Sequence, residues 1–580
     1  MNDNVIIFLH LAILGFWVLT ALKNIIFWTY VWQIKEYRLD RMTAYFELPS
    51  SRATILNARF LLSLALLCMS VVMVLWQGFW FIDWPLSVAI LAFYVLMLLR
   101  FFEQVRRKET HYPQITSRAA MVLVVSALVH LGIVAAVLQF DNTYLLVALV
   151  TIDFLAPVLC SIGVVVSTPI ARIMKRRILE GARRKREQMK GLLVIGITGS
   201  YGKTSTKEFI VALLSERFKV LTTVANNNTE MSVARTILND LNNSYDIFVA
   251  EMGAYKKGEI ATTASIAQPT IGVLTGIGPQ HLSLFGSMQN TQKAKYELIE
   301  ALPEKGLAVF NGDNDIVKDL FYQCEKPKRL YASNAFVDKN APGVRAESTK
   351  YINKGTEIKV REGQKQKTET ITTDLLGKHN VSNLMGAITV AREVGMSFDE
   401  IRQGIKKIES IEHTLKPLYG LNESLVIDDS YSGNMHGVFA ALDVLQRMQG
   451  KQKIMIFLPL IELGSIAEKA HKDIGAKIGE VCDACIVVSQ DYFPILYEEA
   501  VKHGMHKDKM LCITKPDQVV QHIKEMVQKQ DIILLENRIN PSITQGLLAK
   551  KNGNGSEKSK DKKNQNATKD QKNKKDKKKK

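Results

Sequence analysis

Residues 192–208 read LLVIGITGSYGKTSTKE, and this stretch decides the fold of the chain after it. Its first six residues predict a short apolar strand, and residues 209–214 fit one face of a helix. Glycines between a strand and a helix let the backbone approach a phosphate, and the first amides of the helix attract anions. The run is G-x-x-G-x-x-G-K-T, and it departs from the strict G-x-x-x-x-G-K-[ST] spacing because position 197 is Ile. A chance Gly-Lys-Thr in a surface loop is the alternative, and the flanking elements favour a phosphate-binding loop.

Side chains that phosphoryl transfer needs recur downstream. The apolar run 246–251 ends in Glu251, and a later strand is followed by a loop that contains His281 and then by a segment with Lys295. Transfer of a γ-phosphoryl group to a carboxylate brings anions together, so it demands metal ions and cationic side chains. In isolation His281 would be a solvated loop histidine and Lys295 part of a solvated helix face. Their ordered occurrence after Lys203 favours a catalytic site.

These residues resemble the Mur ligase family, the ATP-dependent amide ligases of bacterial cell-wall synthesis, and most closely its D-alanyl-D-alanine-adding branch. The run GITGSYGKTSTKE is nearly the nucleotide loop of that family, and the resemblance continues in order from residue 191 to about residue 545. It implies a P-loop-type Mur ligase central domain, a Rossmann-like C-terminal ligase domain, and ATP and Mg²⁺ as cofactors.

The resemblance also implies residue roles. In the family, the residues matching Glu251 and His281 help to bind Mg²⁺, and the lysine matching Lys295 is carbamylated; Lys293 is close enough in register to be the alternative. The implied catalytic residues are Lys203, Lys295 and His281, and the implied metal ligands are Thr204, Glu251 and His281.

Three more stretches match the family's substrate or nucleotide contacts. They are the Asn-rich run 226–230, the NGDND segment 311–315 and the LGKHNVSNL segment 376–384; the first two would read as plain turns if they stood alone. The implied nucleotide-binding residues are Gly199, Ser200, Gly202, Lys203, Thr204, Ser205, Asn311, Asp313, His379 and Asn380. The implied substrate-binding residues are Asn228, Glu230, Asp428, Asp429 and Ser430.

From about residue 411 the chain starts a second parallel α/β structure, with strands expected near 425–429, 453–458, 484–488 and 531–535. Its DDSYSGNM run at 428–435, the ELG run at 462–464 and His471 match family positions. The hinge arginine of the family has no clear counterpart in residues 412–417, where Lys416 is a substitute point charge, and the usual K-[GA]-S-R reads Glu536-Asn537-Arg538. These departures leave the amine substrate open.

Five apolar stretches, near 5–32, 59–79, 85–102, 119–139 and 144–168, predict membrane-spanning helices, because about 20 residues cross the hydrocarbon. Every second connection between these stretches is rich in Lys and Arg. Because such connections stay on the cytoplasmic side of a membrane, we expect the residues after 170 to lie in the cytoplasm. Asp153 and His130 inside these stretches either line a substrate path or are satisfied between packed helices. The helices take the place of the soluble nucleotide-sugar domain of the family.

The predicted organisation is an α-helical membrane bundle (1–170), a basic juxtamembrane linker (171–190), a central domain (191–410), a C-terminal domain (411–550) and a disordered Lys-rich tail (551–580). Half of the net charge of +18 lies in that tail, which argues against a nucleic-acid partner. Cys482 and Cys485 form one C-x-x-C without a second pair, and core packing is preferred for them over zinc or redox chemistry.

The sequence therefore predicts a multi-pass ligase of the cytoplasmic membrane, with its catalytic domains in the cytoplasm. The expected partners are the lipid bilayer, a carboxylate acceptor that is lipid-linked or a nucleotide-sugar peptide, and an amino acid or dipeptide amine. Two alternatives stay open at this point. One is a D-alanyl-D-alanine-adding muramyl-tripeptide ligase with an anchor, and the other is a non-catalytic nucleotide-binding membrane scaffold or a transporter.

Overall fold

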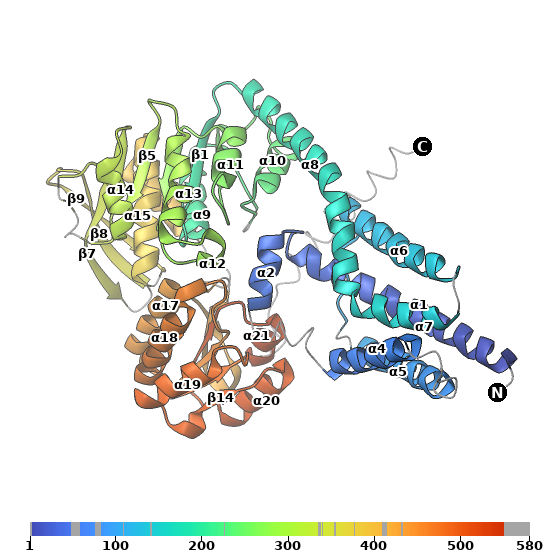
Figure 1. Cartoon of the computed structure of the whole chain (residues 1–580). Helices are drawn as coiled ribbons and strands as arrows, with labels where there is room; N and C mark the ends of the chain where they lie inside the picture. Colours follow the sequence, from blue (N-terminus) through green and yellow to red (C-terminus); the bar gives the residue numbers. More distant parts are fainter. Residues whose placement is uncertain are drawn as a thin grey trace, which may run out of the picture.

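The structure, a computed structural model, divides into an N-terminal group of helices and two α/β domains (Figure 1). It describes residues 3–47, 58–75, 83–107, 110–139, 142–224, 227–334, 338, 340–352, 355–375, 377–408, 415–430 and 433–549. The Lys-rich tail, the hinge residues 409–414 and Asn226 lie outside the described residues.

The N-terminal group consists mostly of apolar helices. Its helices are α1 (Asp3–Ile34), α2 (Leu39–Glu47), α4 (Ala58–Leu75), α5 (Asp83–Arg106), α6 (Ser117–Val137), α7 (Asn142–Phe154) and α8 (Ala156–Gln188). Within the described residues, four stretches are long and apolar enough to cross a membrane: Val5–Ile34, Trp84–Arg106, Ser117–Val137 and Ala156–Gln188. The predicted number of five spans differs from these four because Ala58–Val72 and Tyr144–Phe154 are shorter apolar helices.

The fifth predicted span, 144–168, is wrong as a single helix. Helix α7 ends at Phe154 and α8 begins at Ala156, with Pro157 in the first turn of α8. Proline fits this position because the first turn of a helix leaves its amides without intrahelical acceptors. At the break, Asp153 pairs with Arg59 of α4 at 3.1 Å and accepts a hydrogen bond from Asn24 of α1. The structure therefore supports the alternative in which Asp153 is satisfied between packed helices.

The predicted basic linker 171–190 is also wrong as a separate segment, because α8 continues through it to Gln188. Ala182, Ile178 and Leu179 of α8 pack into the same apolar cluster as residues of α10 and α11. Arg186 is buried, and its guanidinium donates hydrogen bonds to the carbonyls of Ala267 (3.1 Å), Met189 (3.2 Å) and Leu192 (3.3 Å). The helix thus ties the N-terminal group to the middle domain.

The middle domain is built on a six-stranded parallel sheet in the order β2-β3-β1-β4-β5-β6. Its strands are apolar at most positions because helices cover both faces. The strands are β1 (Leu193–Thr198), β2 (Val220–Thr222), β3 (Ile247–Glu251), β4 (Ile271–Leu274), β5 (Leu307–Asn311) and β6 (Lys328–Tyr331). The helices are α9 (Lys203–Leu214), α10 (Glu230–Asn239), α11 (Glu259–Ala267), α12 (Leu282–Phe285), α13 (Met288–Glu300), α14 (Asp315–Gln323), α15 (Lys378–Glu393) and α16 (Phe398–Lys406).

A small antiparallel sheet, which was not predicted from the sequence, is inserted before α15. It consists of β7 (Val344–Ile352), β8 (Gly355–Glu362) and β9 (Thr368–Thr373) in that order. Ala346, Ile358, Val360 and Ile371 are buried and join the core that β1, α9 and α15 share. This sheet therefore packs against the outer side of α15 rather than forming a separate domain.

The C-terminal domain has a second six-stranded sheet in the order β10-β11-β15-β12-β13-β14, with only the edge strand β10 antiparallel to its neighbour. Its strands are β10 (Lys416–Tyr419), β11 (Leu425–Asp429), β12 (Lys453–Phe457), β13 (Ala484–Val487), β14 (Met510–Cys512) and β15 (Ile532–Glu536). Its helices are α17 (Met435–Arg447), α18 (Ala467–Val481), α19 (Phe493–Lys502), α20 (Pro516–Met526) and α21 (Pro541–Leu547), with short 3₁₀ helices η1 (Leu421–Glu423), η2 (Gly464–Ile466) and η3 (Lys507–Lys509). The four strands expected here are confirmed.

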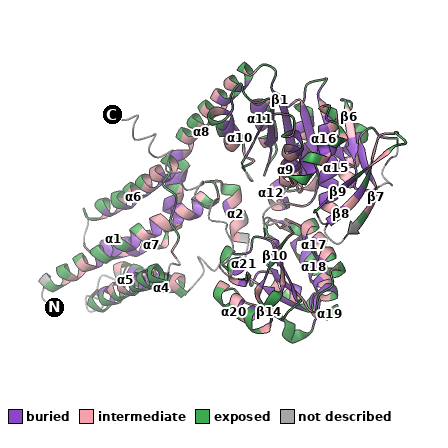
Figure 2. Cartoon of the chain, turned by 180° about the vertical axis from the view of Figure 1, so that it is seen from behind, coloured by how far each residue is buried: buried purple, intermediate pink, exposed green. Residues whose placement is uncertain are grey.

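Burial differs between the N-terminal helices and the two domains (Figure 2). The strands of both sheets are buried, whereas the outward faces of α1, α4, α5 and α6 are exposed although they are apolar. Phe8 is 74% exposed, Leu75 is 75% exposed and Leu128 is 63% exposed. Cys482 and Cys485 are buried in an apolar cluster of the C-terminal domain, which confirms that they are core residues.

Candidate active site

The phosphate loop joins β1 to α9 at the carboxyl edge of the middle sheet. Gly199 has φ +154°, and a Cβ there would lie 2.1 Å from Thr275 Oγ1, so only glycine fits. Gly202 has φ +78°, and a Cβ there would lie 2.7 Å from Asn383 Oδ1. The amide of Ser200 donates to the carbonyl of Gly276 at 2.7 Å, which holds the loop on the residues after β4. The predicted strand, loop and helix are all present.

Lys203 lies inside this loop. Its Nζ donates to the carbonyl of Gly199 at 2.8 Å, and burial lowers its pKa while the nearby carboxylate of Glu251 opposes that shift. Ser205, in the first turn of α9, lines the same cavity as Lys203. The loop therefore presents a cation and helix amides to one space.

Glu251 and Thr204 are brought together by the sheet. Strand β3 pairs with β1 in register Ile197↔Glu251, so the carboxylate stands beside the loop. Thr204 Oγ1 donates to Glu251 Oε2 at 2.9 Å, and Asn228 Nδ2 donates to Glu251 Oε1 at 2.9 Å. Glu251 is 1% exposed, so its charge is held by these contacts and by Lys207 Nζ at 3.9 Å.

A hydroxyl and a carboxylate are hard oxygen ligands that fit Mg²⁺, which commonly takes one or two protein oxygens together with substrate phosphates and water. His281, the third predicted metal ligand, is engaged elsewhere: its Nδ1 pairs with Glu462 of the C-terminal domain. Within the described ranges, no group of three or more His, Cys, Asp or Glu side chains surrounds a metal-sized space. The oxygen pair of Thr204 and Glu251 is the part of the predicted set that the structure assembles.

Lys295 lies on α13 behind this pair. It is 3% exposed, its Nζ donates to the carbonyl of Ala254 at 3.4 Å, and it sits 5.5 Å from the centre of the Phe285 ring. Burial, assisted by the charge of Lys203, lowers its pKa from 10.5 to about 7. Lys293, the alternative in register, is exposed. The structure thus places Lys295, and not Lys293, beside the site.

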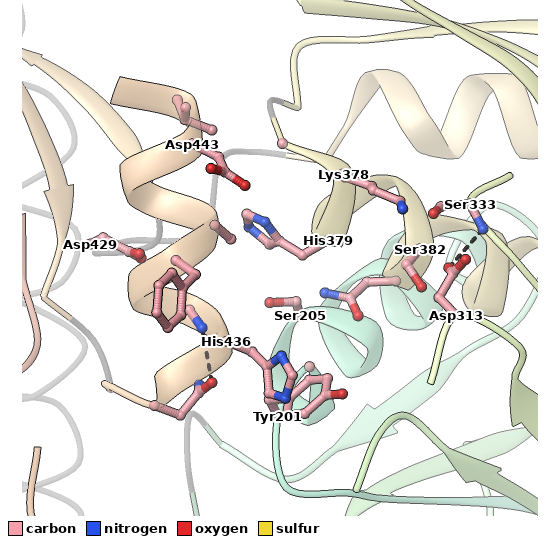
Figure 3. Close-up of a pocket in the computed structure, with 18 of the residues that line it drawn as sticks. Tyr201, Ser205, Asp313, Ser333, Lys378, His379, Ser382, Asp429, His436 and Asp443 are labelled. Atoms are coloured by element: carbon pink, nitrogen blue, oxygen red, sulfur yellow. Dashed lines mark hydrogen bonds between the residues drawn. The ribbon is translucent and has the colours of Figure 1, made fainter. Parts of the chain in front are cut away.

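A cavity of about 650 Å³ lies between the phosphate loop and the C-terminal domain (Figure 3). Its middle-domain wall includes Lys203, Asn311, Asp313 and His379. Asp313 accepts hydrogen bonds from the amide of Ser333 at 2.7 Å and from Asn334 Nδ2 at 3.0 Å. Burial lowers the pKa of His379 to about 4, so its ring is neutral at pH 7. Asn380 is buried next to His379 and does not line the cavity.

The opposite wall is formed by α17. Figure 3 shows Asp443 of this helix facing His379 across the cavity. The ring of His436 packs on that of Tyr201, with 4.8 Å between their centres. Arg447, in the last turn of α17, also lines the cavity. Tyr201, His436, Asp443 and Arg447 were not predicted from the sequence, and only Asn434, in the 428–435 run, carried a signal that could have pointed to this helix.

Of the three predicted substrate residues at 428–430, only Asp429 lines the cavity. Asp428 is turned inward and accepts hydrogen bonds from the amide (3.1 Å) and the hydroxyl (2.5 Å) of Ser430. Burial raises the pKa of Asp429 to about 7, and it faces Glu536, whose pKa is raised by burial and by the Asp429 charge. The two acids therefore share a buried contact at the carboxyl ends of β11 and β15.

Two other predicted residues lie away from the cavity. Glu230 begins α10 and forms an ion pair with Lys175 of α8. His471 is buried in α18, accepts from the amide of Leu460 at 3.1 Å and stacks on Tyr492 with ring centres 4.0 Å apart. Its contacts give His471 a structural role in the C-terminal core.

A second, smaller cavity of about 70 Å³ adjoins the first on the side of His281. It is lined by Tyr201, Gln280 and His281 from the middle domain and by Glu462 and Arg538 from the C-terminal domain. The two cavities share Tyr201, Gln280, Asn434 and His436. The two cavities together therefore extend from the phosphate loop to His281 and the C-terminal residues beside it.

Comparisons with known proteins agree with this geometry. Residues 197–391 match the Mur ligase middle domain, and residues 417–536 match the Mur ligase, glutamate ligase domain. UDP-N-acetylmuramoyl-tripeptide–D-alanyl-D-alanine ligase of Escherichia coli (strain K12) is 31% identical over 351 residues, which cover 59% of this chain and 73% of that protein. The enzyme of the same name from Bacillus subtilis (strain 168) is 30% identical over 349 residues, 60% of this chain and 73% of that protein.

Solved structures show the same fold. MurF from Acinetobacter baumannii superposes with a TM-score of 0.57 at 23% identity, covering 64% of this chain and 80% of that one. MurF ligase from Thermotoga maritima, solved in complex with ADP, superposes with a TM-score of 0.56 at 23% identity, covering 64% and 83%. On its two matched domains and its likeness to these relatives, the chain belongs to the Mur ligase family.

Proposed function

We propose that this protein is a membrane-anchored, ATP-dependent ligase of cell-envelope synthesis that activates a carboxylate as an acyl phosphate for attack by an amine. One observation carries the proposal: Lys203 and Thr204 line a cavity whose other wall is the C-terminal domain, and Thr204 is hydrogen-bonded to buried Glu251. Lys295 is buried, which lowers its pKa, and it lies close enough for the charge of Lys203 to lower that pKa further. Charge on a transferring phosphoryl group needs cations placed in advance, and this cavity has them.

Each residue has a defined task in this reaction. Lys203 stabilises negative charge on the transferring phosphoryl group, and the helix amides after Gly202 hold the phosphates. Thr204 and Glu251 would hold Mg²⁺, with His281 at the margin; the bound ion would neutralise phosphate charge. Lys295 loses its proton near neutral pH, so its amine can accept CO₂ and become a carbamate.

The amine substrate would enter from the C-terminal side. Approach of α17 to the phosphate loop would exclude water from an acyl phosphate, which water otherwise hydrolyses. Asn311, Asp313 and His379 line the nucleotide end of the cavity, and Asp429 lines the end nearest β11. Arg447 lines the cavity and supplies a cation there, whereas the hinge arginine of the family has no clear counterpart in residues 412–417.

Membrane anchorage is supported by the apolar surface of the N-terminal helices. Their outward side chains are large, apolar and exposed, which in water would be unfavourable over so wide an area. The Lys- and Arg-rich connections support a cytoplasmic position for both α/β domains. The bilayer is therefore the proposed partner of these helices, and the acceptor is proposed to be lipid-linked or delivered at the membrane.

The printed name of the relatives favours a second candidate, the D-alanyl-D-alanine-adding reaction on a soluble muramyl tripeptide. The full chain in lipid nanodiscs, given ATP, Mg²⁺ and D-alanyl-D-alanine, would separate the two. Phosphate release and product mass are measured with either UDP-muramyl tripeptide or a native lipid extract as acceptor. Release that needs the lipid extract supports the first candidate, and release that needs the tripeptide supports the second. Both candidate functions would be contradicted if the unaltered chain bound ATP but released no more phosphate than Lys203→Ala with either acceptor.

A further inference from the structure

The turn between α1 and α2 brings the N-terminal helices to the middle domain. Glu36 and Tyr37 in this turn have φ of 57° and 55°, a left-handed conformation that redirects the chain. Met42 of α2 is buried in the same apolar cluster as Trp28 of α1, and α2 also packs on α12, which begins directly after His281. Figure 1 shows α2 between the N-terminal helices and the two α/β domains. Helix α2 therefore joins the N-terminal helices to the part of the middle domain that carries His281.

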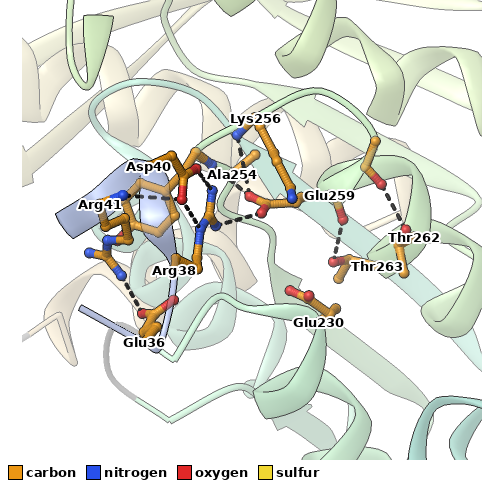
Figure 4. Close-up of polar contacts among 12 residues, drawn as sticks. Glu36, Arg38, Asp40, Arg41, Glu230, Ala254, Lys256, Glu259, Thr262 and Thr263 are labelled. Atoms are coloured by element: carbon orange, nitrogen blue, oxygen red, sulfur yellow. Dashed lines mark hydrogen bonds and ion pairs between the residues drawn. The ribbon is translucent and has the colours of Figure 1, made fainter. Parts of the chain in front are cut away.

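Two arginines attach this segment to the loop that follows β3 (Figure 4). Arg38 forms an ion pair with Glu259, the first residue of α11, at 2.7 Å, and the other oxygen of Glu259 accepts from the amide of Tyr255 at 2.7 Å. The guanidinium of Arg41 pairs with Glu36 at 2.6 Å and lies 4.3 Å from the centre of the Tyr255 ring, a cation–π contact. The side chains of Arg38 and Arg41 are 18% and 14% exposed, so water screens these contacts little. One arginine thus holds the amide of Tyr255 through a carboxylate, and the other holds its ring.

The loop that these arginines hold touches several residues of the site. Residues 252–258, all of which the structure describes, form neither helix nor strand, so side-chain contacts set the position of this loop. The loop begins directly after Glu251, and Lys295 Nζ donates to one of its carbonyls at 3.4 Å. The ring of Tyr255 meets the ring of His281 edge to face, with centres 4.7 Å apart. A shift of this loop would therefore be felt at Lys295 and at His281.

His281 is the point where this loop meets the C-terminal domain. Its φ of 57° and ψ of 30° are a left-handed conformation, which a residue other than glycine keeps only when the surrounding contacts enforce it. The ring is held by Tyr255 and by Glu462, which pairs with Nδ1. The amide of Ser283 donates to the carbonyl of Glu462 at 3.3 Å, and α12 also packs on η2 of the C-terminal domain. Arg41, Tyr255, His281 and Glu462 thus form one continuous row from α2 to the second cavity.

We infer that Arg38 and Arg41 are positioning residues of the active site. By holding Tyr255 against His281, they keep His281 in contact with Glu462 and so fix how the two α/β domains face each other. The described walls of the two cavities contain neither arginine, so both act through Tyr255 and not on a substrate. Docking of the N-terminal helices is in this way a condition for full activity. For its effect on the reaction the inference rests on the proposed function, whereas the arrangement of the domains is measured without ATP.

The distance between the two domains tests the positioning role. The full chain in phosphatidylcholine nanodiscs carries spin labels attached through Lys305→Cys in the middle domain and Lys469→Cys in the C-terminal domain, both at exposed positions. Cys68→Ser and Cys512→Ser remove the two cysteines that are not buried. Double electron–electron resonance without ATP then reports how widely the distance between the labels is distributed.

Arg41→Ala and Tyr255→Leu should broaden this distribution, because each interrupts the row that holds His281 on Glu462. Both should lower kcat for phosphate release about tenfold and leave the KM for ATP within about twofold, since neither touches the phosphate loop. Arg41→Lys keeps the cation and Tyr255→Phe keeps the ring, so each should recover most of the loss. Arg107→Ala, which removes an exposed arginine paired with Glu103, is the matched control and should change neither measurement.

A double variant shows whether α2 acts through His281. His281→Ala alone should broaden the distance distribution as much as Arg41→Ala does, and the two together should broaden it no further, because both remove one contact. Further broadening in the double variant would overturn the inference. So would an unchanged distribution in monodisperse Arg41→Ala and Tyr255→Leu. Arg38→Ala interrupts the attachment at a different residue, so the test stands if one of the other variants does not fold.

Phosphate release by the unaltered chain separates this inference from the proposed function. If Arg41→Ala and Tyr255→Leu broaden the distribution but the unaltered chain releases no phosphate, the positioning role stands and the proposed function fails. If the unaltered chain releases phosphate and both variants keep its distance distribution, the positioning role is wrong and the proposed function stands.

Discussion

Thr204 lies in the first turn of α9 and Glu251 is the last residue of β3, and the Thr204 hydroxyl donates to the Glu251 carboxylate at 2.9 Å. The register that pairs Ile197 with Glu251 places this carboxylate beside the phosphate loop. The same carboxylate also accepts from Asn228 at 2.9 Å, so its two oxygens are both oriented. A metal that binds here would meet a ligand pair already in position.

Glu251→Gln should remove the negative charge that this pair offers to Mg²⁺ while keeping the size of the side chain. We expect ATP-dependent phosphate release to fall by about 100-fold and to need more Mg²⁺ for half-maximal rate. A Mg²⁺ titration of phosphate release measures both effects. Glu304→Gln, at an exposed acid between α13 and β5, should leave the titration unchanged. Equal Mg²⁺ dependence in Glu251→Gln and the unaltered chain would contradict the assignment.

Lys295 should become carbamylated as pH rises through about 7. Its pKa is lowered from 10.5 to about 7 by burial and by the charge of Lys203, so the neutral amine that reacts with CO₂ is the minor form below pH 7 and the major form above it. With ¹³C-bicarbonate, a carbamate carbon signal is expected to grow between pH 6 and pH 8. Lys295→Gln should lack the signal, and Lys293→Gln should retain it. If Lys293→Gln lost the carbamate signal instead, Lys293 would be the carbamylated residue.

Asp429 and Glu536 should make the chain less stable as pH rises through about 7. Burial raises the pKa of Asp429 from 3.8 to about 7, and burial with the Asp429 charge raises that of Glu536. Acids with a higher pKa in the folded state contribute stability that is fully present below their unfolded pKa and is lost as pH rises through the folded pKa. Melting temperature measured from pH 5 to pH 8 should fall, and Glu536→Gln should flatten that fall. Glu498→Gln, on an exposed face of α19, should leave the fall as it is.

Arg186→Ala should destabilise the attachment of α8 to the middle domain. The substitution leaves the carbonyls of Ala267 and Leu192 without their buried donor, and we expect a loss of roughly 2–3 kcal/mol in the free energy of unfolding. Arg183→Ala removes only an exposed pair with Glu187 and should cost about 0.5 kcal/mol or less. Denaturant unfolding followed by limited proteolysis near residue 190 measures both. Similar losses for the two variants would show that Arg186 is not a structural anchor.

The local sequence pattern was sufficient to predict the phosphate loop, the position of Glu251 and the four expected strands of the C-terminal domain. These features depend on neighbouring residues: a strand, a glycine-rich turn and a helix amino end are encoded within a few residues, and a carboxylate at the end of an apolar strand stays at the sheet edge. Lys295 was also expected, although only its burial distinguishes it from Lys293.

The lengths of the apolar stretches were not sufficient to predict where the N-terminal helices begin and end. Residues 144–168 look like one span, but the proline at 157 begins a new helix, and the basic residues after 170 continue that helix onto the middle domain. The antiparallel sheet β7–β9 was missed because its burial comes from α15, which lies outside its own sequence.

The sequence by itself determined the family, the nucleotide loop and the chemistry of phosphoryl transfer, because these are written in short runs whose geometry is local. Only the tertiary structure decided that α17 closes the cavity with Asp443 and Arg447 and that His281 pairs with Glu462. Such contacts join residues more than 100 positions apart. They depend on how helices and sheets pack, which no short stretch of sequence specifies.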